Sequence, residues 1–305
     1  MAAPFVNYIA YNRLGLTARN LKSILDTPED FEMHIIDSNS KDDTWDFIRD
    51  LKDERIKSKT RLPINAGPIY GVNLNLSKRK SDQYFITIDS DVFMQTKDWI
   101  SRFMKIFDTF PNVGAMGVMR GKPYPQVYPP VIPRVKDEVS YLELKNGKVD
   151  EVLDFVHGCC MCLRPELIEE IGYWSEENGY GDAELCPRIT NYTSFKVGFM
   201  TDIDYNPIID FTMEQRVSCD ECTARDYCKL DKTENTCFTI NSSRYKNESF
   251  ASKFKWKYLE TFKELEEGKR TAYCASSFDQ LSMKEHVYNH DWALENFQYY
   301  IDNSN

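Results

Sequence analysis

The first ninety residues alternate between short apolar stretches and stretches with helical spacing. Residues 5–10, 33–36 and 84–88 have the composition of buried strands. Between residues 5–10 and residues 33–36, apolar side chains recur at the spacing of one helix face. Strands that alternate with helices form a mostly parallel sheet with helices on its faces. We therefore predict an α/β fold with a Rossmann-like, mostly parallel sheet covered by helices.

Polar residues stand where these strands end. Asp37 follows the second strand, and Asp89 and Asp91 follow the strand at 84–88. Asn65 precedes another helical stretch. Ligands of such sheets bind beyond the carboxyl ends of the strands. Two carboxylates one residue apart offer hard oxygen ligands to a divalent cation and the diphosphate that it carries, which indicates chemistry on a nucleotide-sugar.

Four segments, in this order, resemble the family 2 glycosyltransferases, which have the GT-A nucleotide-diphosphosugar transferase fold. They are residues 9–13, 35–44, 65–73 and 88–91. Several matching blocks are more specific than any one short motif. The resemblance covers roughly the first 200 residues, and the remainder has no counterpart.

The resemblance implies a donor site. Asp37 would accept a hydrogen bond from the nucleotide base, usually uracil, in a pocket that the first turn also lines. Asp89 and Asp91 would serve Mn²⁺ or Mg²⁺, with Asp91 the direct ligand and Asp89 orienting the ribose or a metal-bound water. The implied donor-binding residues are Ala10, Tyr11, Asn12, Arg13, Asp37, Asn65, Gly67, Asn73, Asp89 and Ser90. The ion would neutralise charge on the departing diphosphate.

The resemblance also implies a general base. Residues 156–166, 171–174 and 179–188 are similar to later blocks of the family, and Asp182 stands at the position of its inverting base. Gly181 stands where the family usually has Glu. Glu184 is therefore an alternative general base, and transfer with retention of configuration stays open. In a purely structural alternative, both acids interact with the positive end of a helix dipole.

Composition agrees with an enzyme that carries an appendage. The chain has 305 residues, 42% of them apolar, and we expect a transferase domain over 1–210, a Cys-rich module over 211–240 and a helical extension over 241–305. We find no signal sequence or long apolar run, so we expect a cytoplasmic protein. The net charge of −10 disfavours general nucleic-acid binding.

Four of the nine cysteines form a C-x2-C-x5-C-x8-C pattern in a polar segment: Cys219, Cys222, Cys228 and Cys237. A segment this polar cannot bury its own core, and four thiolates suit tetrahedral, structural Zn²⁺. Two disulfides are the alternative, disfavoured in a reducing compartment. We expect the other five cysteines to pack in the core.

Residues 250–268 and 282–300 predict two amphipathic helices, the second with a capping box of Ser282 and Glu285. His286 and His290 on that helix could share a metal edge or lie on the surface. The proline-rich residues 123–133 predict a lid or acceptor wall, with a surface loop as the alternative.

The sequence therefore predicts a metal-dependent glycosyltransferase, in the glycosyl-transfer class EC 2.4. It would move a sugar from a nucleotide-diphosphosugar, UDP-linked, to a hydroxyl of a polysaccharide, lipid, protein or modified nucleobase, with inversion. A nucleotidyltransferase is the first alternative, although residues 11–15 match its phosphate-gripping loop poorly. A non-catalytic sugar-nucleotide-binding scaffold is the second.

Overall fold

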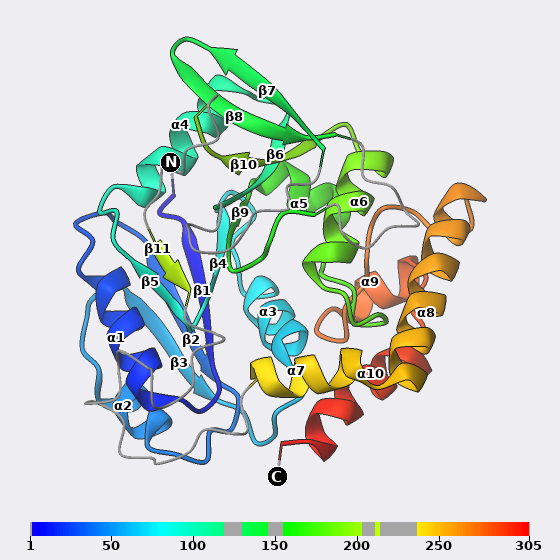
Figure 1. Cartoon of the computed structure of the whole chain (residues 1–305), viewed down its shortest axis with the longest axis horizontal. Coiled ribbons are helices and arrows are strands. Elements are labelled where there is room, and N and C mark those ends of the chain that lie inside the picture. The colour runs from blue at the N-terminus through cyan, green and yellow to red at the C-terminus, as the bar shows by residue number, and fades with distance from the viewer. Residues whose placement is uncertain (1, 119–129, 146–154, 203–210, 214–236, 305) are drawn as a thin grey trace.

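The computed structural model describes residues 2–118, 130–145, 155–202, 211–213 and 237–304 (Figure 1). The strands are β1 (Phe5–Ala10), β2 (Glu32–Asp37), β3 (Ile56–Arg61), β4 (Phe85–Asp89), β5 (Val92–Met94), β6 (Val113–Val118), β7 (Val131–Lys136), β8 (Val139–Leu144), β9 (Cys160–Leu163), β10 (Lys196–Met200) and β11 (Phe211–Met213). The helices are α1 (Leu14–Leu25), α2 (Thr44–Asp50), α3 (Pro68–Leu76), α4 (Trp99–Thr109), α5 (Pro165–Ile171), α6 (Asp182–Tyr192), α7 (Cys237–Lys246), α8 (Glu248–Glu266), α9 (Gln280–Glu285) and α10 (His290–Asp302).

Nine strands form one sheet in the order β3-β2-β1-β4-β9-β6-β10-β8-β7. Seven of them, β3, β2, β1, β4, β6, β10 and β7, point the same way, and only β9 and β8 run in the opposite direction. The prediction of a mostly parallel sheet is confirmed in this sense. The short strands β5 and β11 pair separately, in antiparallel orientation.

Side chains that alternate along each strand build two cores. Val6 and Tyr8 on β1 face the core that α1, α2 and α4 cover, whereas Phe5 faces the core under α3, α5 and α6. Strand β9 divides in the same way, with Cys160 and Cys162 on the first face. The expected packing of the cysteines is confirmed, because all five described outside α7 are buried free thiols.

The antiparallel strand β9 brings a distant segment to the end of β4. Ile88 pairs with Cys160, so the turn before β9 lies at the same sheet edge as Asp89. That edge also carries the ends of β1 and β2, because Ala10 pairs with Asp37. The predicted strand ends therefore meet at one edge.

The C-terminal helices pack beside α3 and α6 on the second face of the sheet (Figure 1). Helix α8 lies where residues 250–268 predicted one, but the single helix predicted at 282–300 is wrong. The chain forms α9 and then α10, capped by Asp279 and Asn289 in place of the Ser282 capping box. His286 ends α9 and stacks on Tyr273 at 4.1 Å, so it shares no helix face with His290.

Within the described ranges, every helix is too short or too polar to cross a lipid bilayer.

Candidate active site

The carboxylates of the Asp-x-Asp segment stand at the end of β4. Asp89 is exposed, and Asp91 is partly buried with its Oδ2 3.9 Å from the guanidinium of Arg13. The turn between them is fixed by Asn20, whose side-chain amide donates to the carbonyl of Ser90 at 2.9 Å. Both charges also act on the buried phenol of Tyr8, whose pKa is raised first by burial and then by Asp91 and Asp89.

The loops after β1 and β2 form one unit. Asn12 and Arg13 have left-handed backbone angles, with φ of 56° and 62°, which non-glycine residues adopt rarely. The side-chain oxygen of Asn12 accepts from the backbone amide of Lys41 at 2.8 Å, and the backbone amide of Asn12 donates to Ser40 Oγ at 2.8 Å. Asp42 accepts from the amide that starts α1. These bonds fix the first turn against the loop that follows Asp37.

Asp37 is fully buried at the end of β2. Its Oδ1 accepts from the Ser40 amide at 3.0 Å and lies 3.6 Å from Arg61 Nε, while its Oδ2 has no hydrogen-bond partner among the described residues. Burial raises the pKa of this carboxyl group. The partner Arg61 was not predicted, and the only signal for it was a basic residue at the end of a strand.

Three predicted donor-binding residues turn toward the end of α10. The amide of Asn65 donates to Ser304 Oγ at 2.9 Å, and the phenol of Tyr11 donates to the Ser304 carbonyl at 2.9 Å. Gly67, at φ 90°, lies so close to the Tyr300 ring that a Cβ there would come within 2.4 Å of it. The residues after β1 and before α3 therefore share a boundary with the C-terminal helix, which the sequence did not reveal.

Asn73 binds the chain that leads to the proposed base. Its amide donates to the Trp174 carbonyl at 2.8 Å and to Glu176 Oε1 at 2.9 Å, and its Oδ1 accepts from the Trp174 amide at 3.0 Å. All three groups are buried. In this structure Asn73 holds the segment before α6.

One backbone turn joins strand β4 to Asp182. Cys159 accepts from the Asp89 amide at 2.9 Å, and the neighbouring Gly158 donates its amide to Asp182 Oδ2 at 2.7 Å. Asp182 is the first residue of α6 and is partly exposed. The carboxylates of β4 and that of Asp182 are thus linked through two adjacent residues. The sequence pattern around Gly158 matched the family, but this linking function was not predicted.

Glu184 has a different environment. It is fully buried, and its two oxygens accept from Arg188 at 2.7 and 3.2 Å. Arg188, also fully buried, donates further to the carbonyls of Ile171, Tyr173 and Ala272. Bidentate pairing occupies the carboxylate and satisfies a buried guanidinium. Glu184 thereby connects α6 to the loops around it.

Metal-ligating groups are sparse in the part of the chain that the structure describes. It contains no cluster of three or more His, Cys, Asp or Glu side chains placed to hold an ion. Cys219, Cys222 and Cys228 lie outside the described residues, as do residues 123–129 of the proline-rich segment, and Cys237 begins α7. The predicted zinc site therefore stays a prediction.

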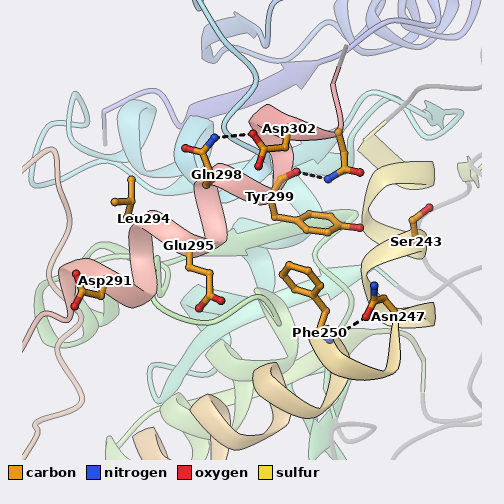
Figure 2. Close-up of a pocket in the computed structure, with 10 residues that line it drawn as sticks. Ser243, Asn247, Phe250, Asp291, Leu294, Glu295, Gln298, Tyr299 and Asp302 are labelled. Atoms are coloured by element: carbon orange, nitrogen blue, oxygen red, sulfur yellow. Dashed lines mark hydrogen bonds between the residues drawn. The ribbon is translucent and has the colours of Figure 1, made fainter.

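A groove of about 740 Å³ lies between α10 and the α7–α8 corner. Figure 2 shows the rings of Tyr299 and Phe250 side by side in it, and they pack edge to face at 4.7 Å. None of the predicted site residues lines the groove; its lining is Ser243, Asn247, Phe250, Asp291, Leu294, Glu295, Gln298, Tyr299, Asp302 and Asn303. Tyr299 separates it from a buried arginine, Arg244.

The sequence profile of glycosyl transferase family 2 matches residues 7–172, which is more than half of the chain. The chain belongs to this family of glycosyltransferases. A comparison with curated proteins found no match.

Solved structures support the fold. The chain is similar to Staphylococcus aureus TarS 1-349, with 14% identity, a TM-score of 0.51, and coverage of 81% of this chain and 73% of TarS. TarS 1-349 in complex with UDP gives 16% identity, a TM-score of 0.50, and coverage of 72% and 62%. The mannosyltransferase PcManGT from Pyrobaculum calidifontis, in complex with GDP-Man and Mn²⁺, gives 17% identity and a TM-score of 0.46. The match covers 67% of this chain and 59% of PcManGT. The chain thus spans less than two thirds of the length of PcManGT.

Proposed function

We propose that this chain transfers a sugar from a nucleotide-diphosphosugar to an acceptor hydroxyl, with a divalent metal and Asp182 as the general base. One observation carries the proposal. The turn at Gly158 and Cys159 bonds to the Asp89 amide on one side and the Asp182 carboxylate on the other. The strand end that carries Asp89 and the candidate base Asp182 are thereby connected at the sheet edge where ligands of such folds bind.

The residues present fit a hard divalent cation. Asp89 and Asp91 offer carboxylate oxygens with partial exposure, and Mg²⁺ and Mn²⁺ are commonly held by one or two carboxylates plus the phosphates of a substrate. When bound, the ion would stabilise negative charge on the departing diphosphate. Asp204 and Asp210 are further carboxylates that could serve as ligands of the ion, and both lie outside the described residues.

Asp182 suits the role of base better than Glu184. Its carboxylate accepts one backbone amide from outside its helix and is partly exposed, so an acceptor hydroxyl can approach it. The Glu184 carboxylate is buried and held by Arg188. A base opposite the leaving group gives inversion, and this stereochemistry is part of the proposal.

The donor is proposed to be UDP-linked. TarS, the neighbour with the higher TM-scores, is described in complex with UDP. In this chain, Asp37 beside the first turn offers a carboxylate acceptor of the kind that the family resemblance assigns to uracil. The acceptor class stays open among polysaccharide, lipid, protein and modified nucleobase.

Calorimetry with a panel of UDP- and GDP-sugars, with Mn²⁺ or with chelator, tests the proposal. We expect one donor to bind in the presence of metal and to be hydrolysed slowly. Asp91→Asn should weaken that binding at least about tenfold, whereas Asp108→Asn, an exposed change on α4, should leave it unaltered. Metal-independent binding would contradict the metal site, and binding of nucleoside triphosphates alone would favour a nucleotidyltransferase. Donor binding without any turnover would favour a scaffold.

A structural zinc ion held by Cys219, Cys222, Cys228 and Cys237 is the second part of the proposal. We expect one zinc per chain by elemental analysis, lost in Cys222→Ser. Thiol titration of the unfolded, chelated protein separates zinc from disulfides. Zinc leaves all nine cysteines reactive, whereas two disulfides leave five, since 9 − 4 = 5.

A further inference from the structure

The segment that leads into Asp182 is held from the C-terminal helices. Asn296 of α10 donates to the carbonyls of Glu176 and Asn178, at 3.1 and 3.4 Å. The carbonyl of Gly179 accepts from Arg244 at 2.5 Å and from the Tyr245 hydroxyl at 2.8 Å. Three carbonyls in four residues are therefore fixed by side chains from elements more than fifty residues downstream.

Arg244 is an unusual residue for a protein interior. It is 1% exposed, and it forms no ion pair among the described residues. Its hydrogen bonds go to Asn296 Oδ1 and the Gly179 carbonyl, both neutral acceptors. A buried cation whose partners among the described residues are all neutral acceptors carries a desolvation cost on the order of several kcal/mol. The other buried arginines of the described residues, Arg164, Arg188 and Arg270, are each paired with a glutamate.

Aromatic rings surround the guanidinium. Its central carbon lies 4.3 Å from the ring centre of Phe254, 5.0 Å from that of Tyr300 and 5.6 Å from that of Tyr245. Ring faces attract cations and offset part of the desolvation cost. The planar guanidinium can stack on these rings while its two terminal nitrogens donate in different directions; an ammonium group has donors but no flat surface to stack.

The backbone at Gly179 is shaped to receive Arg244. A Cβ at this position would come within 2.2 Å of the guanidinium nitrogen, so only glycine allows the approach. Two residues later, Gly181 has φ +56° and directs the chain into α6.

We propose that Arg244 is a positioning residue for Asp182, which it orients by fixing the Gly179 carbonyl three residues upstream. This inference rests on the proposed role of Asp182 and assigns a catalytic purpose to the C-terminal helices. A second donor, Tyr245, binds the same carbonyl and restricts rotation of its peptide plane. Because rates depend steeply on the placement of reacting groups, a small rotation of Asp182 lowers turnover more than donor affinity.

Arg244→Met, Arg244→Lys and Tyr245→Phe test the proposal, with donor hydrolysis as the activity and Mn²⁺ present. We expect Arg244→Met to lower kcat about 10- to 100-fold, with less than about a threefold change in the donor KM. In an Asp182→Asn background, Arg244→Met should add less than about a twofold further loss, because it acts through Asp182. Tyr245→Phe leaves the buried charge in place and should give a smaller loss of the same kind.

Lys257→Met is the matched control. Lys257 is a second buried cation of the same helices, but its ammonium group pairs with Glu295 and forms no hydrogen bond or ion pair with residues 176–182, all of which the structure describes. It should change thermal stability and leave kcat within about twofold. Equal losses of kcat in Lys257→Met and Arg244→Met would overturn the proposal, as would a multiplicative loss in the Asp182→Asn background.

Hydrogen exchange separates this inference from the proposed function. Arg244→Met and Arg244→Lys should raise amide exchange over residues 180–185, and Lys257→Met should not. If exchange rises in the Arg244 variants but the unmodified protein turns over no donor, the contact between Arg244 and the segment before Asp182 is supported and the proposed function is rejected. Unchanged exchange over these residues in folded Arg244 variants would reject the positioning role whatever the activity.

Discussion

Asp37 carries a buried charge that costs stability, at a position where the proposed donor site would use that charge for binding. It is a fully buried carboxylate with one oxygen that has no partner among the described residues, and burial raises its pKa. A carboxyl group with a raised folded pKa binds its proton more tightly in the folded state. The free energy of unfolding therefore falls as the pH rises from the pKa of the unfolded state through the pKa of the folded state. At higher pH this loss of stability remains.

Asp37→Asn should consequently stabilise the protein above that range, by about 1 kcal/mol in urea unfolding at pH 8. The amide keeps an acceptor for the Ser40 amide and removes the buried charge. Affinity for UDP should fall at least about tenfold, because a charged acceptor for the base is lost. Asp46→Asn, an exposed change on α2, is the control. Asp37→Asn with lower stability and unaltered UDP affinity would contradict both expectations.

His34 predicts a pH dependence remote from the site. It stacks on Phe5 at 3.9 Å and contacts Ser58 Oγ at 2.8 Å, and burial lowers its pKa to about 4. The folded state therefore disfavours the proton, and stability is lost as pH falls from about 6.5 toward 4. In His34→Gln this loss should shrink by on the order of 2 kcal/mol. Urea unfolding of both proteins between pH 4 and 7 measures it, and parallel curves would refute it.

At the scale of the element, α6 carries both acids of the predicted site in unlike environments. The helix begins at Asp182, and its next acid, Glu184, faces inward to Arg188. Sequence spacing placed both in the first turn but could not show that Asp182 is partly exposed and Glu184 is buried. That depended on Arg188 reaching carbonyls on two other loops, a contact across 84 residues at Ala272.

Glu184→Gln should destabilise the protein by about 3 kcal/mol, because it leaves the Arg188 charge buried without its carboxylate. Turnover by the folded fraction should persist if Asp182 is the base. Glu166→Gln on α5 removes an exposed acid that pairs with Arg164, and it should cost less than about 1 kcal/mol. Chemical denaturation with parallel activity assays decides the matter: a stable but inactive Glu184→Gln would make Glu184 the base.

Helices and strands with a strongly periodic apolar pattern could be predicted from the sequence, whereas the break within a predicted helix could not. The strands β1, β2 and β4 and the helix α8 lie close to where the apolar pattern placed them. The break between α9 and α10 has no proline or glycine to mark it. It coincides with tertiary contacts, in which Tyr288 donates to Glu176 and the Asn289 amide donates to Glu177.

At the scale of the whole molecule, the C-terminal helices are built into the family fold. Glu176 accepts from Ser276, Ser277 and Tyr288, and Glu177 accepts from Arg270. The predicted division into 1–210, 211–240 and 241–305 followed composition, which carries no information on such long-range bonds. The predicted site residues could be read from motifs; the residues that hold them, such as Arg244 and Ser304, could not.

A chain ending at residue 236 should therefore fail to unfold cooperatively, because it leaves Glu176 and Glu177 without their partners. Calorimetry and near-ultraviolet circular dichroism measure this. We expect retained secondary structure without a sharp thermal transition. A cooperative transition at the full-length midpoint would instead establish 1–236 as an independent domain.

The turn at Gly158 and Cys159 has a consequence for how such enzymes diversify. It links the strand of Asp89 to Asp182 through the main-chain carbonyl of Cys159, which every amino acid supplies, and the main-chain N–H of Gly158, which every amino acid except proline supplies. Substitutions of side chains in the turn, other than to proline at Gly158, leave both main-chain contacts available. Under the proposed function, the side chains of the turn could therefore vary with the sugar or acceptor, whereas an insertion or deletion there would move Asp182 relative to Asp89.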